Sequence, residues 1–488
     1  MRFFCRWKLQ NILSLYSSQD NEKSCLKSCE SHSLQLSLGS LCIGAICIGL
    51  TVGWPEMCSV YYVNPEYLNT TFISLEDAKT TTNLVLNLGA CLGALLPPCL
   101  VDIFGRRHNF AISASIDILF WIILIYSQTL IHLMFTTAIG GIATGSFIVT
   151  VTVYISEVPP LKNYEAVGTL VAFFAYLGIL LGTSLSLSMH NEITLLIMCL
   201  LACIFFVSIY MWIIESPYFL YKTGKTLEAK LVLKVINNAS HISEIESEYN
   251  TIEKFYDSQN SSSKSFLLKI CCSNLTIKSW ISIFIFFLFI GQMLGSYALS
   301  KYTENFIEKV IPEFGKILLS FLDILSLAIC VCLIERVGKK PLFVLSVCGL
   351  SLSCVILAVD ILIHEIVYEN LNYDYEEIIT LCIVVLYCVA YSFGMIPILP
   401  IFISGIFPNR NKTIVVGLCI SILYLCAMIN QSIFEVLNSQ TGTYVAVTAF
   451  AIIGMLGLFF CYYICKFGTG GNFQEFISRI ENALILVP

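Results

Sequence analysis

Residues 215–228 read Glu-Ser-Pro-Tyr-Phe-Leu-Tyr-Lys-Thr-Gly-Lys-Thr-Leu-Glu and open the only long polar segment inside the chain, 215–278. Lysines recur along this segment, and the serine-rich stretch 258–263 is typical of a flexible linker. On each side lies a block built mostly of apolar runs of about 20 residues, the length that crosses a bilayer core as a helix. We therefore expect 215–278 to be a bridge with short helices that joins two membrane-embedded halves.

The composition agrees with this organisation. Hydrophobic residues make up 57% of the 488-residue chain and charged residues only 12%, and the mean hydropathy is +0.82. Soluble globular proteins are far less apolar, so we expect an all-α membrane protein. The 22 cysteines lie mostly in apolar runs, where cysteine behaves as a small hydrophobic residue. Neither a disulfide framework nor a metal site is therefore predicted.

The apolar runs predict twelve transmembrane helices, six before the bridge and six after it. The chain then divides into an N-terminal tail, an N-terminal half, the bridge, a C-terminal half and a C-terminal tail, at 1–34, 35–214, 215–278, 279–465 and 466–488. The predicted helices span 35–58, 81–101, 109–128, 131–156, 166–188, 192–214, 279–300, 314–334, 341–363, 378–404, 413–434 and 443–465.

The positions of the basic residues predict the orientation, because Lys and Arg concentrate in cytoplasmic loops. With both termini in the cytoplasm, most of the 27 Lys and Arg lie inside. The sequence Asn69-Thr-Thr then falls in the first outside loop, where Asn69 can carry an N-glycan. The basic residues left in outside loops are Lys79, Lys301, Lys309 and Lys316.

The two halves contain similar motifs at corresponding positions. Asp102-Ile-Phe-Gly-Arg106-Arg107 follows the second predicted helix, and Glu335-Arg336-Val-Gly-Lys-Lys follows the eighth. Internal duplication, with a binding site between the repeats, is the architecture of many secondary transporters. The sequence also lacks a nucleotide-binding loop, a zinc-protease motif and a catalytic triad, so we expect no enzyme activity.

These motifs, together with Tyr154-Ile-Ser-Glu157, Glu215-Ser-Pro and Gln292-x-x-Gly295, resemble the sugar porter family of the major facilitator superfamily. Within that family the chain is most similar to insect facilitated trehalose and hexose carriers, from the first helix to Phe476. The resemblance implies two pseudo-symmetric six-helix halves that rock about a central sugar site. It also implies a monomeric plasma-membrane carrier surrounded by lipid, with no cofactor and no nucleic-acid partner.

The chain departs from the family pattern around the expected sugar site. The family's Gln-Gln-x-x-Gly-x-Asn in the seventh helix reads here Gly291-Gln292-Met-Leu-Gly-Ser-Tyr297, and the tryptophan of the tenth helix aligns with Pro400. The candidate substrate-binding residues include amide, hydroxyl and carboxylate groups, an aromatic plate and a helix-bending proline. They are Gln292, Tyr297, Asp323, Tyr424 and Pro397. The alternative for Gln292 and the tyrosines is a packing or helix-bonding role.

Asp323 lies in the middle of the eighth predicted helix, where the family has an asparagine. A carboxylate at that depth costs roughly 2.5–3.5 kcal/mol on insertion scales, so it should face the cavity or a partner. We interpret Asp323 as a sugar acceptor or a structural residue. The alternative is a proton site.

Six charged residues near the inner ends of the helices resemble the salt bridges by which the family closes its cytoplasmic side. They are Asp102, Arg106, Arg107, Glu157, Glu335 and Arg336. Because Tyr164, Tyr218 and Gly405 stand where the family has charged partners, we expect a weaker clamp and a larger inward-open population.

The sequence thus favours a facilitative carrier for trehalose, a hexose or a related polyol. Two alternatives stay open. One is a sugar sensor that keeps the fold without transporting, which the changed pocket residues favour. The other is a proton-coupled sugar symporter that uses Asp323.

Overall fold

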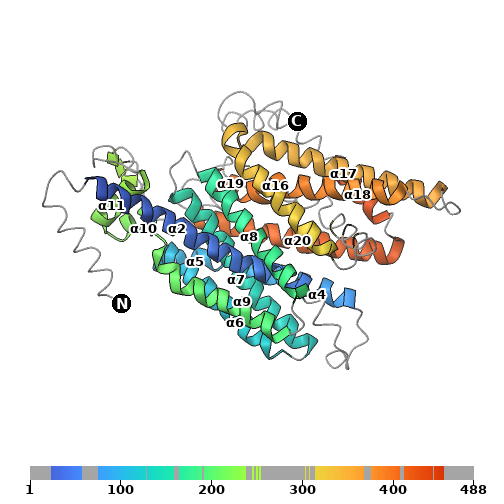
Figure 1. The fold of residues 1–488 in the computed structure, drawn as a ribbon, viewed down its shortest axis with the longest axis horizontal. Coiled ribbons are helices and arrows are strands. Elements are labelled where there is room, and N and C mark those ends of the chain that lie inside the picture. Colours follow the sequence, from blue (N-terminus) through green and yellow to red (C-terminus); the bar gives the residue numbers. More distant parts are fainter. Residues whose placement is uncertain are drawn as a thin grey trace, which may run out of the picture.

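The structure is built of helices throughout the part of the chain that it describes (Figure 1). Among these residues, nine helices are long and apolar enough to cross a membrane, and one bent pair adds a tenth. Asn69, Gln292, Tyr297 and both outermost parts of the chain lie outside the described residues. This computed structural model describes residues 23–57, 75–127, 129–158, 164–188 and 192–237, short pieces within 245–253, residues 300, 303 and 307, and residues 314–367, 375–406, 412–442 and 445–455.

The helices before the bridge form one group around a shared core. Trp54 and Trp121 meet edge to face in this core, with ring centroids 6.0 Å apart. The elements are α2 (Lys23–Val52), α3 (Trp54–Met57), α4 (Leu75–Gly93), α5 (Pro97–Phe104), α6 (Arg106–Ile125), α7 (Leu130–Glu157), α8 (Tyr164–Ser188), α9 (Glu192–Ile209) and η3 (Tyr210–Trp212).

The helices after the bridge form the second group, which lies beside the first in Figure 1. The predicted helix 378–404 is divided here into α18, a π-helical turn and α19, and Pro400 lies inside α19. The elements are α16 (Gly315–Val337), α17 (Lys339–Val367), α18 (Tyr375–Ala390), η4 (Tyr391–Met395), α19 (Ile396–Ile406), α20 (Lys412–Thr441) and the shorter helix Val445–Met455.

Two helices differ from their predicted bounds for physical reasons. The helix predicted at 81–101 is bent by 45° between α4 and α5, because proline has no backbone N–H and its ring disrupts the preceding turn. Helix α2 begins at Lys23, within the predicted tail, although its apolar span begins at Leu34. Hydropathy marks where a helix enters the membrane and does not mark where it begins.

Glycines allow the helices that hold the central site to approach closely. A side chain at Gly145 of α7 would collide with the carbonyl oxygen of Ala90 on α4, and one at Gly49 of α2 would collide with that of Ala175 on α8. Small residues at such crossings bring helix backbones together in membranes. The pairs α4–α7 and α2–α8 therefore form a closely packed wall.

The two groups meet along two seams. Helices α4 and α5 pack against α20, and α8 packs against α16 and α19. At one end of the bundle, where α2 begins, lie α10 (Pro217–Lys222) and α11 (Thr226–Asn237) of the bridge (Figure 1). We call this the charged end, because Arg106, Glu157 and Lys339 lie there.

Candidate functional site

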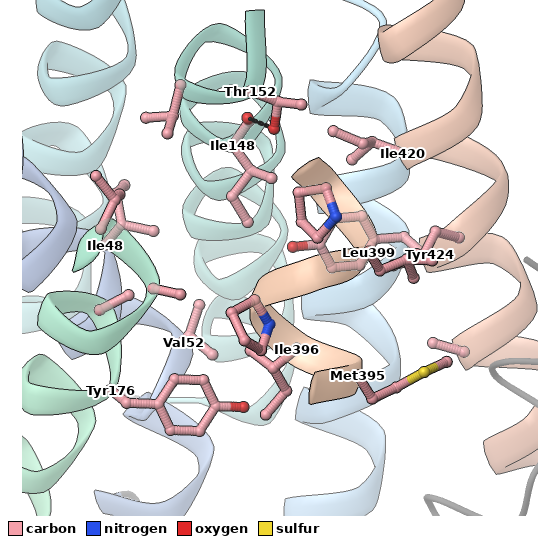
Figure 2. Close-up of a pocket in the computed structure, with 18 of the residues that line it drawn as sticks. Ile48, Val52, Ile148, Thr152, Tyr176, Met395, Ile396, Leu399, Ile420 and Tyr424 are labelled. Carbon is pink, nitrogen blue, oxygen red and sulfur yellow. Dashed lines mark hydrogen bonds between the residues drawn. The ribbon is translucent and has the colours of Figure 1, made fainter. Parts of the chain in front are cut away.

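A cavity of about 450 Å³ lies between the two groups of helices. This size is within the roughly 300–1,000 Å³ that is typical of small-molecule sites. Figure 2 shows its wall, with Ile48 and Val52 from α2, Ile148 and Thr152 from α7, and α19 and α20 opposite them. Because both groups supply the wall, any relative movement of the groups changes the cavity.

Amide side chains from α4 and α20 form one polar part of the cavity wall. They are Asn83, Asn87, Asn430 and Gln431. Gln431 is buried, and its Nε2 donates a hydrogen bond of 2.9 Å to the carbonyl oxygen of Thr80. Within the described part of the chain, no donor reaches its Oε1 atom. A buried acceptor without a donor is costly, so a solute hydroxyl that binds Gln431 Oε1 would be favoured.

The sequence pattern did not single out Gln431. The signal was present, because adjacent Asn and Gln residues in an otherwise apolar helix are unusual. The position of Gln431 on the cavity wall, however, depends on how α20 packs against α4.

Four tyrosines also line the cavity: Tyr176 from α8, Tyr387 from α18, Tyr391 from η4 and Tyr424 from α20. The rings of Tyr387 and Tyr391 are stacked, with centroids 5.8 Å apart and 16° between their planes. Tyr176 projects from α8 into the space beside Ile396 in Figure 2. Of the candidates from the sequence, Tyr424 and Pro397 lie on this wall.

Asp323 is half-buried on α16, where its Oδ1 accepts a hydrogen bond from Ser392 Oγ of η4. Its carboxyl group interacts electrostatically with the phenols of Tyr176, Tyr387 and Tyr391. Asp323 is not itself among the described residues that line the cavity. The hydrogen bond from Ser392 therefore places the carboxylate next to the turn that carries Tyr391, one of the phenols on the wall.

At the charged end, Arg106 and Glu157 form a buried bidentate ion pair. Arg106 Nη2 donates to Glu157 Oε1 and Nε lies beside Oε2, each at 2.9 Å. The pair joins the start of α6 to the end of α7, so it lies within the N-terminal group of helices. Arg106 also lies over the ring of Phe219, 5.7 Å from its centroid.

Glu215 caps the start of α6. Its Oε1 accepts the backbone N–H groups of Arg106 and Ser216, at 2.9 and 3.0 Å, and its Oε2 accepts that of Arg107 at 3.2 Å. A Cβ at Gly105 would lie 2.5 Å from Oε2, so this approach requires glycine. Burial raises the pKa of the Glu215 carboxyl above its usual range, against the opposing effect of these N–H donors.

Of the other residues of the expected salt-bridge network, Asp102, Glu335 and Arg336 are exposed and Arg107 is half-buried. Asp102 pairs with Lys222 of the bridge at 2.9 Å. Glu335 and Arg336 are exposed at the end of α16, and no ion pair joins either one to another described residue. Within the described parts of the chain, these six residues therefore place no ion pair between the two groups of helices.

Two lysines connect the groups instead. Lys339, at the start of α17, lies 2.9 Å from Glu165 Oε1 and donates to the hydroxyl of Tyr164, both on α8. Its ammonium also lies 4.9 Å from the centroid of the Tyr164 ring. Lys412, buried at the start of α20, donates to Ser156 Oγ of α7 at 3.0 Å. Neither of these lysine contacts was predicted from the sequence.

Comparisons with known proteins agree with this architecture. The family model described as "Sugar (and other) transporter" matches residues 66–477. "Sugar transporter ERD6-like 7" of Arabidopsis thaliana is 24% identical, over 77% of this chain and 81% of that protein. "Glucose transporter GlcP" of Staphylococcus epidermidis is 25% identical, over 81% and 88%.

Among solved structures, the major facilitator superfamily proton:xylose symporter XylE, bound to 6-bromo-6-deoxy-D-glucose, superposes with a TM-score of 0.72. The match covers 88% of this chain and 96% of that one at 16% identity, which supports the fold alone. The fold is therefore the all-α major facilitator fold that the sequence predicted. Because the family model spans well over half of its length, the chain belongs to the sugar (and other) transporter family.

Proposed function

We propose that this protein carries trehalose, a hexose or a related polyol across the plasma membrane by facilitated alternating access. The observation that carries the proposal is the cavity of about 450 Å³, which is lined by both groups of helices. Its amides can pair with sugar hydroxyls, and its tyrosine rings can lie against the apolar faces of a sugar ring. The named relatives are transporters by their descriptions, in agreement with the expectation that the chain is not an enzyme.

The more detailed expectations from the sequence, on solute, orientation, glycan, oligomeric state and division of the chain, belong to the same proposal. The relatives named above come from a plant and a bacterium. The resemblance of the sequence motifs to insect trehalose and hexose carriers stays part of the proposal, and the choice of solutes rests on it. We further propose cytoplasmic termini, a glycan on Asn69, a monomeric carrier in contact with lipid, and the division into two halves and a bridge at 35–214, 215–278 and 279–465. The charged end is then the cytoplasmic end.

The proposed solute contacts combine residues from sequence and structure. They are Gln292, Tyr297, Asp323, Pro397, Tyr424 and Gln431. For the gate, we propose that Asp102, Arg106, Arg107, Glu157, Glu335 and Arg336 stabilise the inner ends of the helices, and that Lys339 and Lys412 join the two groups.

Counterflow into proteoliposomes tests this function. Vesicles that contain the purified protein and unlabelled sugar are diluted into labelled trehalose, glucose, fructose or sorbitol, with protein-free vesicles as the control. Saturable counterflow of at least one sugar is expected. Absence of counterflow, combined with a sugar-dependent rise in melting temperature, would identify a binding protein that does not transport.

A further inference from the structure

Asp323 has no cationic partner among the residues that the structure describes. Its Oδ1 accepts from Ser392, and no described residue donates to its Oδ2. The buried Asp117 of α6 differs, because Thr51 donates to its Oδ1 at 2.7 Å and Cys203 donates to its Oδ2 at 3.2 Å. Of these two intramembrane carboxylates, only Asp323 keeps an oxygen free for a further partner.

No basic side chain is available near the middle of this region. The described residues that line the cavity include no Lys, Arg or His. The predicted helix 279–300, which lies almost wholly outside the described residues, contains none in its sequence either. The basic residues of α16 and α20, Lys316, Arg336 and Lys412, are confined to the helix ends. No basic side chain of these helices is therefore placed to balance a negative charge on Asp323.

Tyrosines line the cavity next to the turn that binds this carboxylate, because Tyr391 directly precedes Ser392, the hydrogen-bond donor to Asp323. Tyr176, Tyr387 and Tyr391 come from three different elements, interact electrostatically with Asp323 and line the cavity. The faces of such rings attract ammonium groups, by about 2 kcal/mol or more where water is excluded. Aromatic rings on a cavity wall with a carboxylate behind them are a combination that can bind an organic cation.

The position of this cluster is fixed by the π-helical turn. Ser346 Oγ of α17 donates to the carbonyl oxygen of Ala390 at 2.5 Å, immediately before η4. A Cβ at Gly394 would lie 2.6 Å from Ser346 Cβ, so η4 is held tightly against α17. Ser392 then points to Asp323 while its neighbour Tyr391 lines the cavity. Single π-helical turns of this kind are frequent at functional sites.

We propose that the cavity accepts a sugar that carries a protonated amine, with the ammonium group among these tyrosines and Asp323 as its counter-charge. A neutral sugar supplies hydroxyl groups but no positive charge, and a carboxylate away from water is costly unless it is paired. This inference rests on the proposed function and narrows its substrate class to amino sugars, of which glucosamine is the simplest test compound.

Competition in the counterflow assay tests this specificity near neutral pH. Glucosamine, N-acetylglucosamine and glucose compete with a labelled neutral sugar, because N-acetylation removes the charge and keeps the ring. We expect glucosamine to inhibit at a concentration about ten-fold lower than the other two, as one ammonium–aromatic contact allows. Asp323→Asn, a substitution of nearly equal size, should abolish this difference, which is read as the ratio of the three half-inhibitory concentrations on the variant itself and not from its rate of neutral-sugar exchange.

Asp360→Asn is the matched control. Asp360 lies on α17, where it accepts a hydrogen bond of 3.0 Å from Thr380 and is not among the cavity-lining residues. Its substitution should leave the preference intact. If Asp323→Asn does not fold, the ranking of the three competitors on the unmodified protein decides the question alone.

Several outcomes would overturn the inference. Equal inhibition by the three sugars would refute it and leave the proposed function standing. The same holds if Asp323→Asn keeps the preference, or if a pH gradient drives neutral sugar uptake through Asp323, since a proton would then supply the missing charge. Absence of exchange for every sugar, glucosamine included, would refute both proposals.

Discussion

Lys412 Nζ donates a hydrogen bond of 3.0 Å to Ser156 Oγ, and this contact joins the two groups of helices at the charged end. Lys412 is buried there at the start of α20, and its charge interacts with those of Glu157 and Arg106. The neighbouring contact of Lys339 with Glu165 joins α17 to α8. Together the two lysines join the two groups of helices at this end.

Replacing Lys412 with Ala should favour the state that is open at the charged end. A hydrogen bond to a charged group contributes about 1.5–3 kcal/mol, so the ratio of open to closed protein should rise by roughly 13- to 160-fold. A cysteine introduced at Ser404, a buried residue of the cavity wall, reports this opening through its rate of labelling by a maleimide in nanodiscs. The same variants without that cysteine correct for labelling of native cysteines.

Lys340→Ala is the control for lost charge, because Lys340 is exposed beside Lys339. Its labelling rate should match that of the unmodified protein. If Lys412→Ala leaves the labelling of the introduced cysteine unchanged, the hydrogen bond to Ser156 does not hold the end closed.

The side chain of Tyr164 should contribute to closure in two separable ways. Its hydroxyl accepts from Lys339 and its ring faces the same ammonium group. Tyr164→Phe keeps the ring and should increase labelling at the Ser404 position by about two- to five-fold, as expected for a net contribution of roughly 0.5–1 kcal/mol. Tyr164→Ala removes both contacts and should increase it further. Equal labelling of the two variants would exclude a role for the ring.

The residues of the gate show which structural features could be predicted from the sequence and which could not. Hydropathy located α7 closely, because its predicted range 131–156 is a long apolar run that differs by one residue at each end from the helix. The sequence also predicted a weaker clamp, because Tyr164 stands where the family has a charged residue. That remains a prediction. The structure adds the contact of the Tyr164 hydroxyl with Lys339, which no spacing rule connects across such a distance in sequence.

The site was less predictable than the helices, because no spacing rule connects residues that are far apart in the sequence. Tyr424 and Pro397 were chosen from motif positions and lie on the cavity wall. The stacked pair Tyr387 and Tyr391 and the link from Ser392 to Asp323 depend on a π-helical turn. An apolar run with prolines predicts a break in the helix, but it does not predict which side chains the break turns toward the cavity.

Breaking the buried ion pair at the charged end should destabilise the protein far more than breaking the exposed one. Glu157→Gln leaves the Arg106 guanidinium buried beside a neutral group, a loss of about 3–5 kcal/mol for pairs of this kind. Asp102→Asn removes the exposed pair with Lys222, where about 0–1 kcal/mol is expected. The melting temperatures of the two detergent-solubilised variants measure these losses. Equal losses would show that the buried ion pair stabilises the protein no more than the exposed one.

The pKa of Glu215 predicts a pH dependence of stability. Burial raises the pKa of this carboxyl in the folded protein above its unfolded value, which is near 4.3 for Glu. The stabilisation linked to its protonation is therefore complete below the unfolded pKa and is lost as pH rises through the folded pKa. The melting temperature of the unmodified protein should accordingly fall, relative to that of Glu215→Gln, as pH rises across this window.

Glu228→Gln is the control for this pH profile, because the side chain of Glu228 on α11 is 38% accessible and lies 3.6 Å from Lys225 in a loose ion pair. Its profile should run parallel to that of the unmodified protein. A Glu215→Gln profile that is also parallel would show that Glu215 does not titrate differently in the folded state.

Removing the side-chain amide of Gln431 should weaken solute binding without changing the fold. Gln431 lies on the cavity wall, and no described residue donates to its Oε1, so a solute hydroxyl that reaches this atom would gain a hydrogen bond. Loss of one such bond, about 0.5–1.5 kcal/mol, should raise the half-saturating sugar concentration in counterflow by roughly two- to thirteen-fold. Gln440→Ala, at the exposed end of the same helix, should have no effect. If Gln431→Ala instead lowers only the maximal rate, Gln431 acts on the movement of α20 and α4, which it joins through Thr80, and does not bind the solute.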